Sequence, residues 1–274
     1  MGLFSGMKGN KAIKLHNSGD LEGAKAMYEQ AFADGCQEAR VVLAYAVLLI
    51  RLEEYQKARE HLVKYQKVPM SEEQKSQLRM NYAVCCYKLG EVDRAVKMLE
   101  NIHLHHPTGL IYETLGYLYA EKYDLKNKPE PAPVVEAAAD ETPEGEETAA
   151  TAEASAQPQL DPLAVWEEGV QKALKFNEEA IDYDDEDSIC LDNMGQIYYR
   201  VLGDKVEARK WFDKAYALKE DQIDTLWFLS RYDLEEGKKD EAIKKLEAIL
   251  ERRFSSLNYV TKEQVEQELA ALKA

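Results

Sequence analysis

The feature that most constrains the fold of this chain is an internal repeat in which a small residue is followed, at helical spacing, by a large residue and then by a second small or apolar residue. The first copy is Ala24, Tyr28 and Ala31. The leading alanine returns after steps of 34, 37, 78, 35 and 34 residues, at Ala58, Ala95, Ala173, Ala208 and Ala242. Offsets of four and seven residues share one face of an α-helix, so each copy predicts a helix with one packed stripe. A step of this length indicates a stack of similar helical units.

A second pattern, large-small-x-x-large, precedes several copies of the first. It is found at Tyr45, Ala46 and Leu49; at Tyr82, Ala83 and Cys86; at Leu115, Gly116 and Tyr119; and at Met194, Gly195 and Tyr198. With both patterns the chain resembles the tetratricopeptide repeat (TPR) family, whose 34-residue helix-turn-helix units place small residues where two helices cross. The resemblance covers residues 5–254 outside one insertion, although the fifth unit has one extra turn residue. It implies an all-α, right-handed superhelix of about six helix pairs, closed by a C-terminal capping helix.

The long step of 78 residues places an insertion inside the fourth unit. Residues 126–161 contain nine acidic residues, two lysines and no aromatic residue, and such a segment buries too little apolar surface to offset the entropy of ordering. We therefore expect units 1–3 and the first helix of unit 4 in 5–125, a disordered acidic insertion in 126–161, the second helix of unit 4 with units 5 and 6 in 162–254, and the capping helix in 255–274. The insertion is either a tolerated loop or a regulatory strand that covers basic residues of the inner surface.

Charge and hydropathy exclude several classes of partner. The chain has 35 Lys and Arg against 51 Asp and Glu, for a formal net charge of −16, which disfavours binding to nucleic-acid phosphates. Its longest apolar stretch, residues 41–50, is about half as long as the roughly 20 residues of a membrane-spanning helix. The four cysteines have no CxxC spacing, as is typical of reduced thiols. We expect a cytoplasmic protein with no nucleic-acid or membrane partner.

Three groups of residues are candidates for reactive sites. His103, His105 and His106 end a predicted helix, where imidazoles favour the free carbonyls, and no cysteine or carboxylate stands at ligand spacing. Cys85 and Cys86 fit a buried helix face. The acidic run 178–187 lacks the glycine and distal glutamate of a calcium loop, so we expect a helix end followed by a cap at Asp187 or Ser188. We therefore predict no metal, no cofactor and no enzyme activity.

The resemblance implies that partner peptides lie on the concave surface, which the first helix of each unit lines. Read in the register of the repeat, the residues that we predict to bind a partner there are Val47, Arg51, Asn81, Val84, Tyr87, Tyr117, Asn193, Tyr199 and Arg231. Aliphatic and tyrosine side chains would bury partner residues, while asparagines would bond to its main chain and arginines would fix its register.

One subgroup of the family clamps a chaperone C-terminal carboxylate with two Lys, two Asn and one Arg. The corresponding positions here hold Gly9, Ile13, Ala44, Gln77 and Asn81, or, one unit later, Leu43, Val47, Asn81, Leu110 and Thr114, so we predict no such clamp. The function that the sequence favours is a non-catalytic scaffold that binds a peptide or helical segment of a partner protein. The alternative is a structural homo-oligomer that assembles through the solenoid ends or the capping helix.

Overall fold

The computed structural model describes residues 3–131 and 161–274, and in these ranges the chain forms thirteen α-helices and no strand. The first helices of the six units are α1 (Leu3–Ser18), α3 (Ala39–Arg51), α5 (Glu72–Lys88), α7 (Gly109–Lys122), α9 (Ser188–Gln196) and α11 (Ile223–Glu235). The second helices are α2 (Leu21–Ala33), α4 (Tyr55–Tyr65), α6 (Val92–His105), α8 (Pro162–Tyr183), α10 (Lys205–Leu218) and α12 (Lys239–Leu250). The last helix is α13 (Lys262–Lys273).

Local capping sets several helix starts. Ser71 and Gln74 form a reciprocal capping box at α5, and Thr261 and Gln264 form another at α13. Each box satisfies two backbone N–H groups that the first helical turn cannot pair internally. Asp187 caps α9 by accepting hydrogen bonds from two backbone N–H groups. The interpretation of the acidic run as a helix end followed by a cap is confirmed.

Small residues lie where the helices cross, as the repeat predicts. The six leading alanines are fully buried, at Ala24, Ala58, Ala95, Ala173, Ala208 and Ala242. Gly195 of α9 is closer still to its neighbour, because an added Cβ would lie 2.6 Å from the ring of Phe212 in α10. Such approaches let paired helices share one core, and the predicted all-α superhelix is confirmed.

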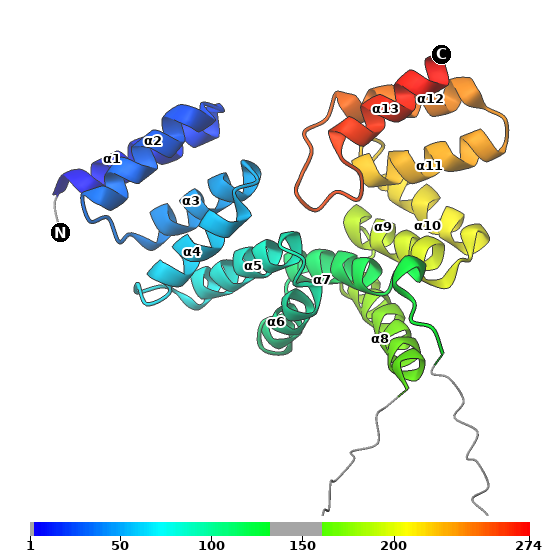
Figure 1. Ribbon diagram of the computed structural model, residues 1–274, viewed down its shortest axis with the longest axis horizontal. Helices are drawn as coiled ribbons and strands as arrows, with labels where there is room; N and C mark the ends of the chain where they lie inside the picture. The colour runs from blue at the N-terminus through cyan, green and yellow to red at the C-terminus, as the bar shows by residue number, and fades with distance from the viewer. Residues whose placement is uncertain (1–2, 132–160) are drawn as a thin grey trace, which may run out of the picture.

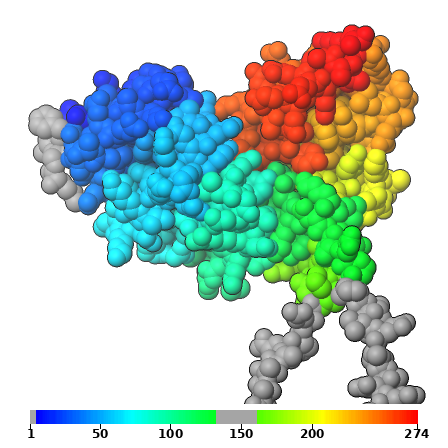
Figure 2. Space-filling model, viewed as in Figure 1, coloured from blue at the N-terminus to red at the C-terminus, as the bar shows by residue number. Residues whose placement is uncertain are grey.

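The units stack into a curved row with two arms (Figure 1). Helices α1–α4 form one arm and α11–α13 form the other, with α5–α10 between them. In the space-filling view the two arms approach each other across the inner side of the curve (Figure 2). The inner surface therefore faces a narrow space rather than an open groove.

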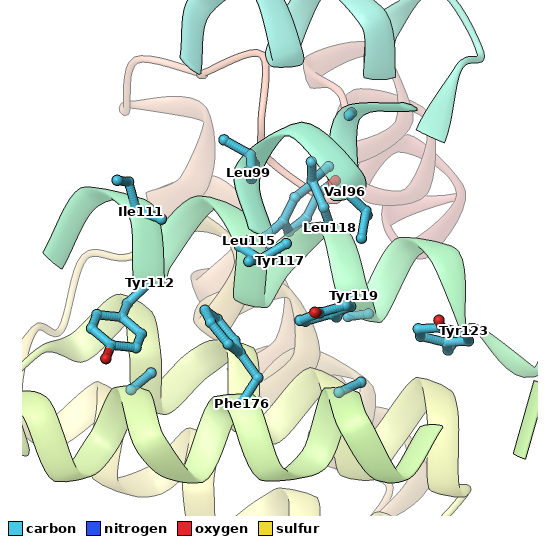
Figure 3. Packing of buried hydrophobic residues seen from close by; sticks show 14 of the residues in the cluster. Val96, Leu99, Ile111, Tyr112, Leu115, Tyr117, Leu118, Tyr119, Tyr123 and Phe176 are labelled. Carbon is cyan, nitrogen blue, oxygen red and sulfur yellow. The ribbon is translucent and has the colours of Figure 1, made fainter. Parts of the chain in front are cut away.

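The central core joins units three and four (Figure 3). Phe176 of α8 points toward Tyr112 and Tyr119 of α7, with ring centroids 5.3 Å apart in both pairs. Leu99 of α6 and Leu115 of α7 are fully buried in the same cluster. Aromatic pairs at this separation stabilise the interface beyond the apolar area that they bury.

The predicted disordered insertion lies mostly outside the described residues. Its first residues, 126–131, are described, so the structured chain extends past the predicted boundary at residue 125. A short 3₁₀ turn, η1 (Leu125–Asn127), forms there because Asp124 accepts a hydrogen bond from the N–H of Lys126 and Asn127 Nδ2 donates one to the carbonyl of Glu121.

The extra residue of the fifth unit is accommodated in a helix rather than in a turn. Helix α9 continues directly into η2 (Ile197–Leu202), a π-helical segment. A π-helical turn contains more residues than an α-helical turn, so it absorbs an insertion without shifting the helix beyond it. Arg200 lies in this segment and is only 5% exposed.

The C-terminal end differs from the expectation of a capping helix over 255–274. Helix α13 begins at Lys262, and residues 251–261 form a non-helical connection to α12, which we call the α12–α13 segment. Connections between helices in compact domains are usually shorter; the one between α11 and α12 spans only residues 236–238. Among the described helices, none is both long enough and apolar enough to cross a membrane.

Candidate functional site

The α12–α13 segment enters the concave side of the solenoid. The segment extends from the C-terminal arm into the space between the two arms (Figure 1). Residues of this segment line two cavities, and the opposite walls of both come from first helices of the repeat units. The predicted binding surface is therefore divided by a part of the same chain.

The N-terminal cavity, of about 360 Å³, lies between α3 and the α12–α13 segment. Val47, an apolar residue that is 37% exposed, stands in its wall. Its lining combines apolar and charged groups from Val47, Ile50, Arg51, Glu53, Tyr55, Arg253, Phe254, Ser255 and Ser256. A concave, mostly apolar pocket with a few polar groups is typical of ligand sites.

Positive charge gathers at this cavity. Burial and the neighbouring Arg253 together lower the pKa of Arg51. Burial, Arg51 and Arg253 lower the pKa of His16 nearby. Arg51 makes no ion pair with any residue in the described ranges. Glu53 also lines the cavity, but no ion pair joins it to Arg51 or Arg253 in the described residues, and two unpaired like charges favour the binding of an anionic group.

The central cavity, of about 440 Å³, lies beside the N-terminal ends of α7, α9 and α11. Its lining includes Leu110, Glu113, Tyr117 and Asn193 on one side and Arg252, Arg253, Leu257 and Asn258 of the α12–α13 segment on the other. Burial, with the negative charge of Asp187, raises the pKa of Glu113 to about 7. This cavity therefore contains a carboxyl group that titrates close to neutral pH.

Of the nine residues that the sequence predicts to bind a partner, Val47 and Arg51 are brought together at the N-terminal cavity. Tyr117 and Asn193 line the central cavity but are 5% and 2% exposed. Asn193 Nδ2 donates to the backbone carbonyl of Glu113, at 2.8 Å. Its amide N–H is thus already used within the fold.

The other predicted residues also take part in internal contacts. The hydroxyl of Tyr87 lies 3.1 Å from that of Tyr117 and donates to Glu121 Oε2 at 3.0 Å. Tyr199 packs against Phe228, with centroids 5.1 Å apart.

Asn81, Val84 and Arg231 complete the set. Arg231 Nη2 donates to Glu268 of α13 at 2.7 Å. Asn81 and Val84 are each 8% exposed, and Asn81 Nδ2 has no hydrogen-bond partner among the described residues. The predicted residues belong to the first helices of the units and to η2, and most of them lie in the interior rather than on an open surface.

Sequence reasoning missed the residues that hold the α12–α13 segment. They are Asp224 on α11 and Arg200 in η2, together with Leu257, Asn258 and Tyr259 in the segment itself. A signal was present, because residues 254–260 combine Phe, Leu, Tyr and Val in a stretch without helical periodicity. Apolar side chains in a long connection indicate a segment that packs against something.

Of the three candidate reactive groups, His103 of the histidine cluster and the two neighbouring cysteines pack against other side chains of the fold. The ring of His103 packs between Tyr112 and Phe176, at 4.8 and 5.1 Å. Cys85 and Cys86 are fully buried, and burial raises the pKa of Cys85 to about 12. In residues 3–131 and 161–274, no three His, Cys, Asp or Glu side chains are placed to hold a metal ion.

No family model matches the chain, and no curated protein matches it. Several solved structures do match the chain. TTC0263, a thermophilic TPR protein of Thermus thermophilus, is similar with a TM-score of 0.59 and 18% identity over 86% of this chain and 99% of that one.

Two further structures are similar over nearly the whole length. PilW, a widely conserved type IV pilus biogenesis factor, has a TM-score of 0.59 and 13% identity over 97% of this chain and 100% of that one. A tetratricopeptide repeat protein from Parabacteroides merdae ATCC 43184 has a TM-score of 0.50 and 13% identity over 100% of both chains. At these identities the likeness concerns the fold, and the chain has the fold of a tetratricopeptide-repeat solenoid.

Proposed function

We propose that this chain is a non-catalytic scaffold that binds a segment of a partner protein on its concave face. The observation that carries the proposal is the N-terminal cavity, where the apolar surface of Val47 lies beside Arg51 and Arg253. Exposed apolar residues in a concavity mark interaction surfaces. The unpaired arginines favour a partner segment that places an acidic side chain beside an apolar one.

The partner would be held by burial of its apolar side chain against α3 and by a charge-assisted hydrogen bond to Arg51. This mode needs no nucleophile or general base. It also differs from the chaperone clamp of the family, because the basic residues stand at the end of α3 and in the α12–α13 segment.

The test is affinity capture from a lysate of the source cell with the native chain and with a Val47→Asp, Arg51→Glu variant. Both substitutions alter the cavity wall without removing a buried side chain. Val206→Asp is the matched control, because Val206 is 76% exposed on α10, a second helix of the repeat. Circular dichroism must show equal helicity in the three proteins.

We expect a protein that the native chain and the control retain and the cavity variant loses. Retention of the same proteins by all three would contradict the proposal. Light scattering on the purified native chain tests the homo-oligomer alternative, for which a monomer at micromolar concentration is the contrary result.

A further inference from the structure

The α12–α13 segment is held on the concave face by anchors that resemble those of a bound peptide. The first anchor is Leu257, which packs against the apolar cluster of the N-terminal units and also against that of the central units. One aliphatic side chain in the segment thus contacts two neighbouring parts of the solenoid, both distant from it in the chain. Burial of such a side chain contributes stability in proportion to the apolar area removed from water.

The second anchor is Tyr259. The guanidinium carbon of Arg200 lies 4.1 Å from the centroid of its ring. The ring also stacks on Phe228, at 5.2 Å. A cation over one aromatic ring and a stacked second ring together recognise an aromatic side chain.

Arg200 is fixed in place for this contact. Its Nε donates to Asp124 Oδ2 at 3.0 Å, its Nη1 donates to Gln196 at 2.7 Å, and its Nη2 pairs with Glu121. With its donors engaged by these side chains, the guanidinium offers its flat face to Tyr259. A preorganised group of this kind loses little freedom when a ligand binds.

The third anchor is the buried carboxylate of Asp224 on α11. It accepts hydrogen bonds from the backbone N–H of Tyr259, at 3.0 Å, and from Asn258 Nδ2, at 3.3 Å. Burial raises the pKa of Asp224, and these two donors oppose that effect. If the segment left, the carboxylate would lose both donors, and an unsatisfied buried acceptor is costly. Asp224 therefore favours an occupied concave face.

The segment fills the concave face only in part. Arg252, Arg253 and Ser255 are exposed, and a cavity lies on each side of the segment. Internally the segment is stabilised by one tight turn, in which Ser255 N–H donates to Asn258 Oδ1 at 2.7 Å and Leu257 N–H donates to Ser255 Oγ at 3.0 Å. Short irregular segments of this kind open locally more readily than packed helices.

We propose that the α12–α13 segment is a built-in ligand of the concave face, and that a partner displaces it by presenting the same pattern, an aliphatic residue followed two positions later by an aromatic one. This inference rests on the proposed function and specifies its partner chemistry. The aliphatic residue replaces Leu257, the aromatic ring replaces that of Tyr259 under Arg200, and the partner backbone N–H replaces the one bonded to Asp224.

The experiment uses a fluorescently labelled synthetic peptide with the sequence of residues 252–260 and measures its binding by fluorescence anisotropy. The receptors are the native full-length chain and a released variant, Leu257→Ser with Tyr259→Ser, whose own segment has lost two of its three anchors while the receptor helices are unchanged. We expect the released variant to bind the peptide at least about tenfold more tightly than the native chain, because buried anchors dominate such interfaces.

Two controls make the result specific. A peptide with serine in place of its leucine and tyrosine must lose binding to the released variant. Addition of Asp224→Ala to the released variant must weaken binding of the original peptide, because the side-chain oxygen that accepts the backbone N–H is gone. Equal binding of the two peptides, or no binding to a released variant that is as helical as the native chain, would overturn the proposal.

If the released variant does not fold, hydrogen exchange on the native chain provides the second test. Saturating peptide should increase exchange in residues 254–260 and leave α3 and α11 protected. Unchanged exchange there at saturation would overturn the proposal. A concentration-dependent dimer of the native chain that Tyr259→Ala abolishes would also overturn the proposal, because the segment would then bind a second copy of the chain.

These results are independent of the partner-capture experiment. Peptide binding by the released variant, without any captured protein, would support the built-in ligand and contradict the scaffold function. A captured partner that the cavity variant loses, without peptide binding by the released variant, would support the scaffold function and contradict the built-in ligand.

Discussion

The N-terminal arm and the central-to-C-terminal half of this solenoid have the same backbone repeat but different interiors. Rings pack in both interiors, and in the N-terminal arm His61 packs against Phe32 and Tyr45 with centroids 4.7 and 4.9 Å apart. In the other half, Arg200 pairs with Asp124 at 2.9 Å in a buried site. Asp192 accepts from Thr225 at 2.6 Å in the same interior.

This difference shows that the repeat itself needs only small residues at the helix crossings. The remaining interior positions are free to carry either rings or charges. The charged interior surrounds the π-helical segment and contacts the α12–α13 segment through Arg200. The buried charges of this half thus take part in holding the segment, in addition to the aromatic packing that both halves share.

The largest expected effect on the free energy of unfolding comes from removing the cation of the charged interior. Arg200→Met leaves Asp124 and Glu121 buried without their cation, so we expect the free energy of unfolding to fall by about 3–5 kcal/mol in urea denaturation. Arg209→Met is the control, because Arg209 pairs with Asp213 and Glu236 at the surface, and its loss should cost no more than about 1 kcal/mol. Similar losses for both variants would mean that the buried charges around Arg200 contribute no more to stability than an ion pair at the surface.

The second expected effect is a pH dependence of the free energy of unfolding that arises from His61 in the N-terminal arm. Burial lowers the pKa of His61 from its usual value to about 4. The unfolded chain therefore takes up this proton at a higher pH than the folded chain. The contribution of His61 to stability is complete above about pH 6.5 and is lost as the pH falls toward about 4, on the order of 2–3 kcal/mol in total. Urea denaturation at several pH values measures it.

His61→Phe keeps a ring beside Phe32 and Tyr45 and removes the titrating group. The difference in stability between this variant and the native chain should therefore change in favour of the variant as the pH falls. A difference that is constant from about pH 7 to about pH 4 would be contrary to a buried neutral histidine.

The smallest expected effect on stability is that of removing one buried hydroxyl from each half of the solenoid. Thr225→Val removes a donor to Asp192, and we expect a loss of about 1–3 kcal/mol because the carboxylate keeps its burial. Tyr28→Phe removes a buried hydroxyl that has no partner among the described residues, so it should be neutral or slightly stabilising. Thermal unfolding followed by circular dichroism compares them. A larger loss for Tyr28→Phe would reverse the contrast between the two halves.

The fold could be predicted from the sequence because its determinants are local. Each helix pair is fixed by residues within about one repeat of each other, and the buried alanines, such as Ala58 and Ala208, stand at regular spacing. The cap at Asp187 was predictable for the same reason, since it depends only on residues 187–190.

The candidate site could be predicted only in part. The inward register of Val47 and Arg51 follows from the repeat, but the filling of the concave face does not. Tyr117 donates to the carbonyl of Asn258, at 3.5 Å, across 141 residues of chain. No periodic pattern encodes such a contact, and so the sequence indicated which side chains face inward but not which of them remain open to a partner.

The most direct test of the account measures whether the α12–α13 segment lies in the concave face of the native chain. Spin labels at Val47→Cys and Ser256→Cys would stand on opposite walls of the N-terminal cavity. The four native cysteines are buried and free, so labelling is expected only at the introduced sites. Electron paramagnetic resonance should show one narrow population at short distance. A broad population at long distance would contradict an occupied concave face and, with it, the built-in ligand.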